Sequence, residues 1–245
     1  MIQRVPSRRH AIADDLRKEI SAGRLKAGER LPSEAQLAAH YKVSTPTLRN
    51  ALALLQSEGL VEKVHGSGNF VRHHLPRVTY LGGGATPGLF NTAHQVSVHT
   101  THLRAQGYLA ALLKVSPHSP LTEFFCVTYE GKSPHSVARI YVPQDRAPAD
   151  MPAGSSLPDG VAAARLAALN PHLAEVQEKV SARLPTPDEA TTLRISSTLA
   201  VLSITRVATD ITGRVVEATL LALPSDRADA VFTTHHTSEA RSTKG

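Results

Sequence analysis

The order of local signals within residues 33–71 constrains the fold more than any other feature of the sequence. Ser33 is a good N-cap, and Gln36 three residues later completes a capping box, so a short helix is expected here. A second helix is expected to begin at Ser44 or Thr45, with a proline in its first turn, where a missing N–H costs little. Its buried stripe follows helical spacing and consists of Leu48, Ala51, Leu52 and Leu55.

The segments on either side of these two helices complete a small domain. Upstream, Ile12, Leu16 and Ile20 lie on one helical stripe, which predicts a first helix. Downstream, the segment LVEKVHGSGNFV alternates around Gly66 and Gly68, which predicts a β-hairpin whose tip needs positive φ. Three helices and a hairpin in this order indicate a winged helix-turn-helix, in which the third helix enters the DNA major groove by its N-terminal end.

Length and charge support two domains with different tasks. The chain has 245 residues, which favours two domains. Its net charge is +6, of which residues 1–74 carry +5, so the smaller N-terminal part is suited to neutralising DNA phosphates. Residues 72–92 contain prolines and a triple glycine, and are expected to form a linker with a short strand at RVTYL. The expected domains are therefore residues 1–74 and 75–245.

The first turn of the third helix supplies the candidate base-reading residues. Ser44, Thr45 and Thr47 are small enough to permit close approach to the duplex. Arg49 lies away from the apolar stripe and suits guanine or a phosphate, although a simple surface charge has the same pattern. Asn50 suits adenine, or is only solvent-exposed.

Two further places are candidates for contact with DNA. His65 and Gly66 at the hairpin tip suit the minor groove or the DNA backbone, unless the tip is an ordinary turn. Ser33 presents a hydroxyl and a helix N-terminal N–H to a phosphate, a role compatible with capping.

The second half of the chain alternates helical and strand patterns. A helix is expected at VSVHTTHLRAQG, residues 96–107, and another at GVAAARLAALN, residues 160–170. Strand pairs are expected around the turn at Gly131 and around the turn at Asp210 to Gly213, and a strand followed by a helix near Pro187 lies between them. Mixed order with hairpins predicts an α+β domain with an antiparallel sheet.

The run from LKAGERLPSEAQLA through VSTPTLRNALALLQSEGLV to GSGNFV resembles the DNA-binding domain of the GntR family of bacterial regulators. The resemblance implies a dimer whose two heads bind an inverted-repeat operator, and a C-terminal effector domain that sets the spacing of the heads. The resemblance also implies repression, which is the usual action of members of this family. The chain departs from the family at Ala35 and Thr45, where arginines implicated in base contact are common. With Arg49 kept, we expect a changed operator preference and more reliance on the wing and backbone.

Residues 75–235 resemble the UTRA effector domain, of chorismate-lyase-like fold, found in the HutC branch of that family. The marks are THLRAQG, YVP, PTPDEATTLRIS and a TRV hairpin followed by Glu217. Effector contact is expected at Glu217, Thr100, Arg139 and Tyr129. The strand EFFCVTY lacks the arginines of sugar-phosphate sensors, and Ala138 replaces their glutamate. The expected effector is therefore a small molecule that is neutral or largely apolar, and not a sugar phosphate, or there is no effector.

Other chemistries have little support in the sequence. No catalytic residue, cofactor or metal site is expected, because nucleophile elbow, phosphate-loop and clustered His/Cys patterns are missing, and paired histidines such as His99 and His102 fall short of a zinc ligand set. Cys126 is expected to be packed. No stretch has the roughly 18 apolar residues of a membrane span, so a cytoplasmic protein is expected. Two alternatives remain: a constitutive repressor with a degenerate pocket, as in mobile-element transfer control, or a chorismate-lyase-like enzyme carrying a DNA-binding head.

Overall fold

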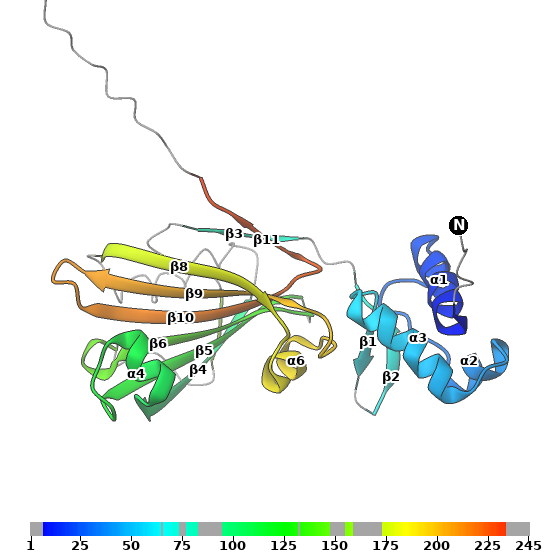
Figure 1. The fold of residues 1–245 in the computed structure, drawn as a ribbon, viewed down its shortest axis with the longest axis horizontal. Coiled ribbons are helices and arrows are strands. Elements are labelled where there is room, and N and C mark those ends of the chain that lie inside the picture. The colour runs from blue at the N-terminus through cyan, green and yellow to red at the C-terminus, as the bar shows by residue number, and fades with distance from the viewer. Residues whose placement is uncertain are drawn as a thin grey trace, which may run out of the picture.

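A computed structural model describes residues 7–64, 66–73, 77–82, 95–131, 133–147, 155–158 and 173–233. The chain forms a small helical head and a larger sheet domain, joined near residue 72 (Figure 1). Among the described residues, no helix is both long and apolar enough to cross a membrane.

The head has the predicted winged helix-turn-helix architecture. Its elements are α1 (Arg8–Ser21), α2 (Glu34–His40), α3 (Thr45–Ser57), β1 (Val61–Val64) and β2 (Gly68–Val71). The strands pair antiparallel as the wing, with Val61 opposite Val71. The predicted stripe of α3 is buried and packs with Ile12 and Leu16 of α1 in one apolar core.

Local chemistry explains why the helices of the head begin where they do. The Gln36 backbone N–H donates to Ser33 Oγ at 3.3 Å, while Ser33 N–H donates to Gln36 Oε1 at 2.9 Å, so the capping box is confirmed. Ser44 caps α3 by accepting from the Thr47 backbone N–H at 3.4 Å. At the wing, Gly66 has φ of +74°, a conformation that L side chains rarely adopt.

The second domain is built on an antiparallel sheet. Among the described residues seven strands join in the order β7-β4-β5-β6-β10-β9-β8. Their bounds are β4 (Gln95–Arg104), β5 (Pro120–Glu130), β6 (Ser133–Pro143), β7 (Ser155–Pro158), β8 (Leu173–Arg183), β9 (Val201–Asp210) and β10 (Val215–Pro224). The turns between β5 and β6 and between β9 and β10 lie where the sequence predicted them.

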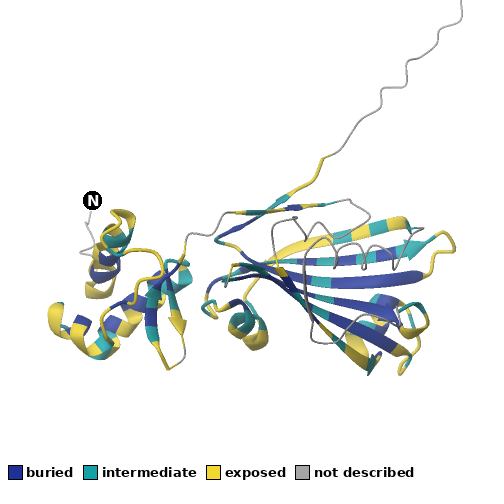
Figure 2. Cartoon of the chain, turned by 180° about the vertical axis from the view of Figure 1, so that it is seen from behind, coloured by how far each residue is buried: buried dark blue, intermediate teal, exposed yellow. Residues whose placement is uncertain are grey.

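Both faces of the central strands are covered. One face carries an apolar core around Phe124, Ile140 and Leu221, over which Tyr80 packs from β3 (Val78–Leu81). That strand pairs parallel with β11 (Ala228–Val231). The other face is covered by α4 (Gly107–Leu113) and α6 (Pro187–Leu193), at opposite ends of the sheet (Figure 1). The central strands β6 and β10 are accordingly buried along most of their length (Figure 2).

One predicted helix is wrong. Residues 95–104 form strand β4, because β-branched Val96, Val98 and Thr100 suit a strand and ten residues pair with β5. Gly107 begins α4 instead of ending a helix. The predicted helix at residues 160–170 lies outside the described residues. The short η1 (Gln144–Arg146) and the strands β7 and β11 were not predicted.

Candidate nucleic-acid interface and effector face

The N-terminal end of α3 presents a small polar surface. Thr45 and Thr47 are partly exposed and Ser44 is exposed, while Leu48 behind them is fully buried. Ser44 Oγ and Thr47 Oγ1 are 2.9 Å apart, which holds both hydroxyls close to the helix end. The short side chains let the backbone of the first turn approach a duplex, as base reading by this end of the helix requires.

Arg49 and Asn50 are both exposed on α3, and Arg49 has a partner on the neighbouring helix. Its Nε donates to Glu34 Oε2 at 2.6 Å, and its side chain is 65% exposed. An exposed pair of this kind is worth less than about 1 kcal/mol, so the guanidinium can exchange Glu34 for a base or phosphate. The bond places the guanidinium beside the N-terminal end of α2.

The remaining residues predicted to contact DNA are exposed, except for one that lies outside the described residues. Ser33 is exposed at the start of α2, and Ala35 is exposed in its first turn, so the missing family arginine leaves a small methyl at the surface. Gly66 is exposed at the wing tip. His65 lies outside the described residues.

Three exposed cations of the head were missed by the sequence reasoning. They are Arg30 beside the wing, Lys42 between α2 and α3, and Lys63 on β1. The Arg30 guanidinium lies over the Gly68 backbone, where an added Cβ would be 3.4 Å from Nε. The excess positive charge of residues 1–74 was the available signal, but it did not identify individual side chains.

A buried charged cluster lies on the sheet face beneath β3. Arg206 of β9 is 1% exposed and donates from Nη1 to Glu217 Oε1 of β10 at 2.8 Å. Its Nε is 3.7 Å from Glu178 Oε1 of β8, and Tyr80 of β3 donates to the same carboxylate at 2.6 Å. Burial and the bond to Glu178 raise the pKa of Tyr80, so it stays a neutral donor. Thr219 Oγ1 also donates to Glu217 at 2.9 Å.

The four predicted effector residues do not form one cluster. Thr100 shares a face with Phe124, and the strand registers place Glu217 on that same face. Thr100 and Glu217 lie on strands three apart, about 14 Å at the usual spacing. Thr100 Oγ1 is buried and has no hydrogen-bond partner among the described residues.

Arg139 and Tyr129 lie on the opposite face of the sheet. Arg139 donates to Glu123 Oε1 at 2.8 Å, and its guanidinium is 4.6 Å from the centre of the Phe125 ring. Tyr129 packs in the apolar cluster under α6. Successive residues of a strand point to opposite faces, so Arg139 is directed away from the face that Glu217 shares.

The histidines and the cysteine that the structure describes lie apart from one another or are buried. No group of three or more His, Cys, Asp or Glu side chains in those ranges could hold a metal ion. His102 bonds through Nδ1 to Thr122 Oγ1 at 3.2 Å, and His99 lies on the other face of β4. Cys126 is fully buried, as predicted, and burial raises the pKa of its thiol to about 12.

Comparison with known proteins agrees with this architecture. Residues 8–71 match the family described as bacterial regulatory proteins, gntR family, and residues 93–229 match the UTRA domain. An uncharacterized HTH-type transcriptional regulator of Rhizobium meliloti, RB1450, is 31% identical over 222 residues, covering 88% of this chain and 90% of that protein. The mannosyl-D-glycerate transport/metabolism system repressor MngR of Escherichia coli is 26% identical over 137 residues, 54% of this chain and 57% of the relative.

Solved structures show the same two-domain fold. The crystal structure of a putative GntR-family transcriptional regulator superposes with a TM-score of 0.55 at 26% identity, covering 94% of this chain and 98% of that one. PhnF from Mycobacterium smegmatis superposes with a TM-score of 0.54 at 19% identity, covering 92% and 100%, which is a likeness of fold alone.

Proposed function

Because the chain belongs to the GntR family of DNA-binding transcriptional regulators, in the HutC-type branch with a UTRA domain, we propose that it is a homodimeric repressor of an inverted-repeat operator. Residues 1–74 bind the DNA, and residues 75–245 dimerise and bind the effector that releases it. The exposed N-terminal part of α3 carries the proposal, because Ser44, Thr47 and Arg49 lie at its surface while a leucine-packed core supports the helix from behind. One relative is itself named a repressor, which supports that direction of control.

We further propose that the effector is a neutral or largely apolar small molecule bound on the face that Glu217 and Thr100 share. The guanidinium of Arg206 is already engaged by Glu217 and faces Glu178, so among the described residues the cluster holds two negative charges against one positive. An anionic ligand would meet net negative charge there, and repulsion in a buried site is costly. Release follows when the ligand favours a head arrangement that does not fit the operator, with coupling of about 1–3 kcal/mol.

The DNA half of the proposal is tested by binding to the inverted repeat upstream of the regulated genes. Fluorescence anisotropy at fixed salt should show specific binding that Arg49→Ala weakens by roughly 1–3 kcal/mol. Glu34→Gln removes the partner of Arg49 without removing the guanidinium, so it should leave specific binding intact. Loss of specificity in Glu34→Gln, or unchanged occupancy in Arg49→Ala, contradicts the assignment.

The effector half is tested by mobility-shift titration with two matched sets of small molecules. Neutral polyols and their phosphate esters are added to the complex at equal concentrations. Release by a neutral compound, lost in Thr100→Val, supports the proposed face. Release of the DNA by a millimolar sugar phosphate refutes the proposed face. If no compound raises the Tm of the chain in a thermal-shift screen, the constitutive repressor is favoured.

A further inference from the structure

The head and the sheet domain meet at a buried ion pair. Arg72, just after β2, donates from Nη1 to Asp226 Oδ2 at 2.5 Å, in the turn between β10 and β11. The two side chains are 6% and 19% exposed. Gly59 at the end of α3 closes on the same turn, because a Cβ there would lie 2.6 Å from Asp226 Oδ2. The two domains are therefore in direct contact at this junction.

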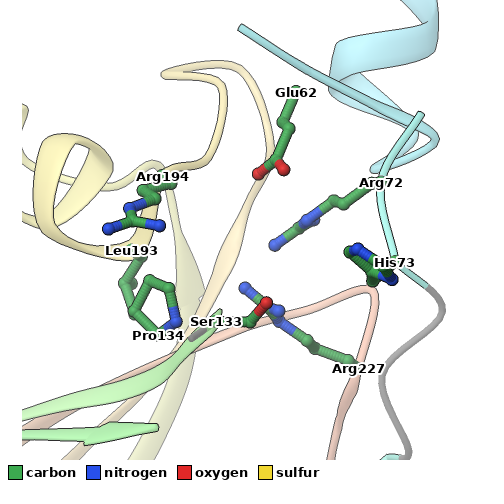
Figure 3. A pocket seen from close by; sticks show the side chains of 8 residues that line it. All are labelled: Glu62, Arg72, His73, Ser133, Pro134, Leu193, Arg194 and Arg227. Atoms are coloured by element: carbon green, nitrogen blue, oxygen red, sulfur yellow. The ribbon is translucent and has the colours of Figure 1, made fainter. Parts of the chain in front are cut away.

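A small cavity lined by charged side chains lies beside the pair. Its charged lining consists of Glu62, Arg72, Arg194 and Arg227, with His73 and Ser133 next to them (Figure 3). The cavity measures about 20 Å³, which is room for one water molecule or an ion of similar size. Three guanidinium groups and one carboxylate line the cavity, and Asp226 contacts Arg72 from beside it.

Two of these arginines point toward one another and are incompletely satisfied. Figure 3 shows the guanidinium groups of Arg72 and Arg227 converging from the two domains. Arg72 Nη2 and Arg227 Nε are buried and have no hydrogen-bond partner in the described part of the chain. Arg227 is 5% exposed. Burial and then the charge of Arg72 lower the pKa of Arg227 to about 10, as expected for two buried like charges.

We propose that the junction cavity binds one small inorganic anion between Arg72 and Arg227. An anion accepts from both unsatisfied N–H groups and offsets the repulsion of the two guanidinium groups. Chloride has the size that the cavity accepts as it stands, and phosphate requires the arginine side chains to move apart. The site is separate from the effector face, which lies toward the other end of β10 at Glu217.

The anion links the posture of the head to the sheet domain. Glu62, Arg72 and His73 belong to the head, while Ser133, Arg194 and Arg227 belong to the sheet domain, so the cavity exists only while the domains are docked. A ligand that binds one arrangement favours that arrangement by its differential affinity. Strand β10 also connects the two sites directly, since it carries Glu217 and runs into the turn that holds Asp226.

The test uses thermal unfolding of the full chain in potassium gluconate, with gluconate replaced stepwise by chloride or phosphate at constant ionic strength. Constant ionic strength separates site binding from general screening. We expect a saturable rise in Tm of roughly 2–4 °C, the size that one kcal/mol of binding produces in a chain of this length. A rise in Tm with chloride alone, with phosphate alone or with both identifies the anion that the site takes. No saturable response to either overturns the proposal.

Three variants locate the response. Arg227→Gln should abolish it. Asp226→Asn leaves the charge of Arg72 without its carboxylate and should lower the half-saturating anion concentration about tenfold, a change of 1.4 kcal/mol. Asp229→Asn is the matched control, because Asp229 pairs with Arg77 in an exposed bridge nearby and its loss should leave the response unchanged. An unaltered response in Arg227→Gln, or a weakened one in Asp226→Asn, contradicts the assignment.

Crystals of the wild type grown with bromide give a direct reading that does not depend on any variant. An anomalous peak between Arg72 and Arg227 confirms a halide site. An ordered water there, with no anomalous signal and no phosphate density in a phosphate-grown crystal, overturns the proposal whatever the unfolding data show.

Discussion

Replacing Glu217 with glutamine removes one charge from the buried cluster while keeping its shape. Glutamine Oε1 can still accept from Arg206 and Thr219, as the glutamate oxygen does at 2.8 and 2.9 Å. At an effective dielectric constant of about 20, the lost attraction is about 6 kcal/mol, and Glu178 at 3.7 Å retains about 4.5 kcal/mol. Breaking a buried pair costs about 3–5 kcal/mol of stability net. Because Glu178 still faces Arg206, Glu217→Gln should lower the free energy of unfolding by about 3 kcal/mol, the lower end of that range.

Arg206→Met should cost more than Glu217→Gln, near 5 kcal/mol, because it leaves two buried carboxylates facing one another. Unfolding in urea is followed by far-UV circular dichroism, since the chain has no tryptophan. The matched control is Arg183→Gln, which breaks the more exposed bridge to Glu189 and should cost less than about 1 kcal/mol. The reasoning is refuted if Glu217→Gln costs no more than the control, or if Arg206→Met is the milder change.

Three shorter predictions concern the junction, a turn and the thiol. Gly59→Ala should destabilise the chain by more than Gly66→Ala, because both residues have φ of +74° but only Gly59 is closely packed; comparison of the two Tm values decides it. Hydrogen bonds, led by that from Thr212, lower the pKa of Asp210 to about 2. The stabilisation of the folded chain by these bonds should therefore be complete above about pH 4 and be lost as the pH falls toward 2. An NMR titration of that carboxyl checks the pKa. Cys126 should resist alkylation at pH 8 until the chain unfolds, and rapid labelling of the native chain would contradict its burial.

The head could be predicted almost completely because its signals are local. The capping box of α2 and the apolar stripe of α3 act over three or four residues, and the glycines of the wing set φ within one residue. Each of these interactions is visible in a short window of sequence. The same windows identified the hairpin turns at Gly131 and Asp210.

The proposed effector face could be predicted only in part. Resemblance made Glu217 a candidate, but Arg206 of the TRV mark was missed, although a cation in an apolar strand was a visible signal. The error at residues 96–107 arose because a short segment with mixed polarity suits either structure, and pairing with β5 decides for a strand. Because successive residues of a strand point to opposite faces, Arg139 and Tyr129 lie on the other face of the sheet from Glu217.

The sequence by itself determined the winged helix-turn-helix fold of the head and the order of the two domains, because neighbours along the chain enforce them. Only the tertiary structure decided which distant charges meet. Arg72 and Asp226 are 154 positions apart, and Tyr80, Glu178 and Arg206 come from three separate strands. Such contacts depend on strand order and register, which are set by burial of the whole sheet and leave no mark in any short stretch of the chain.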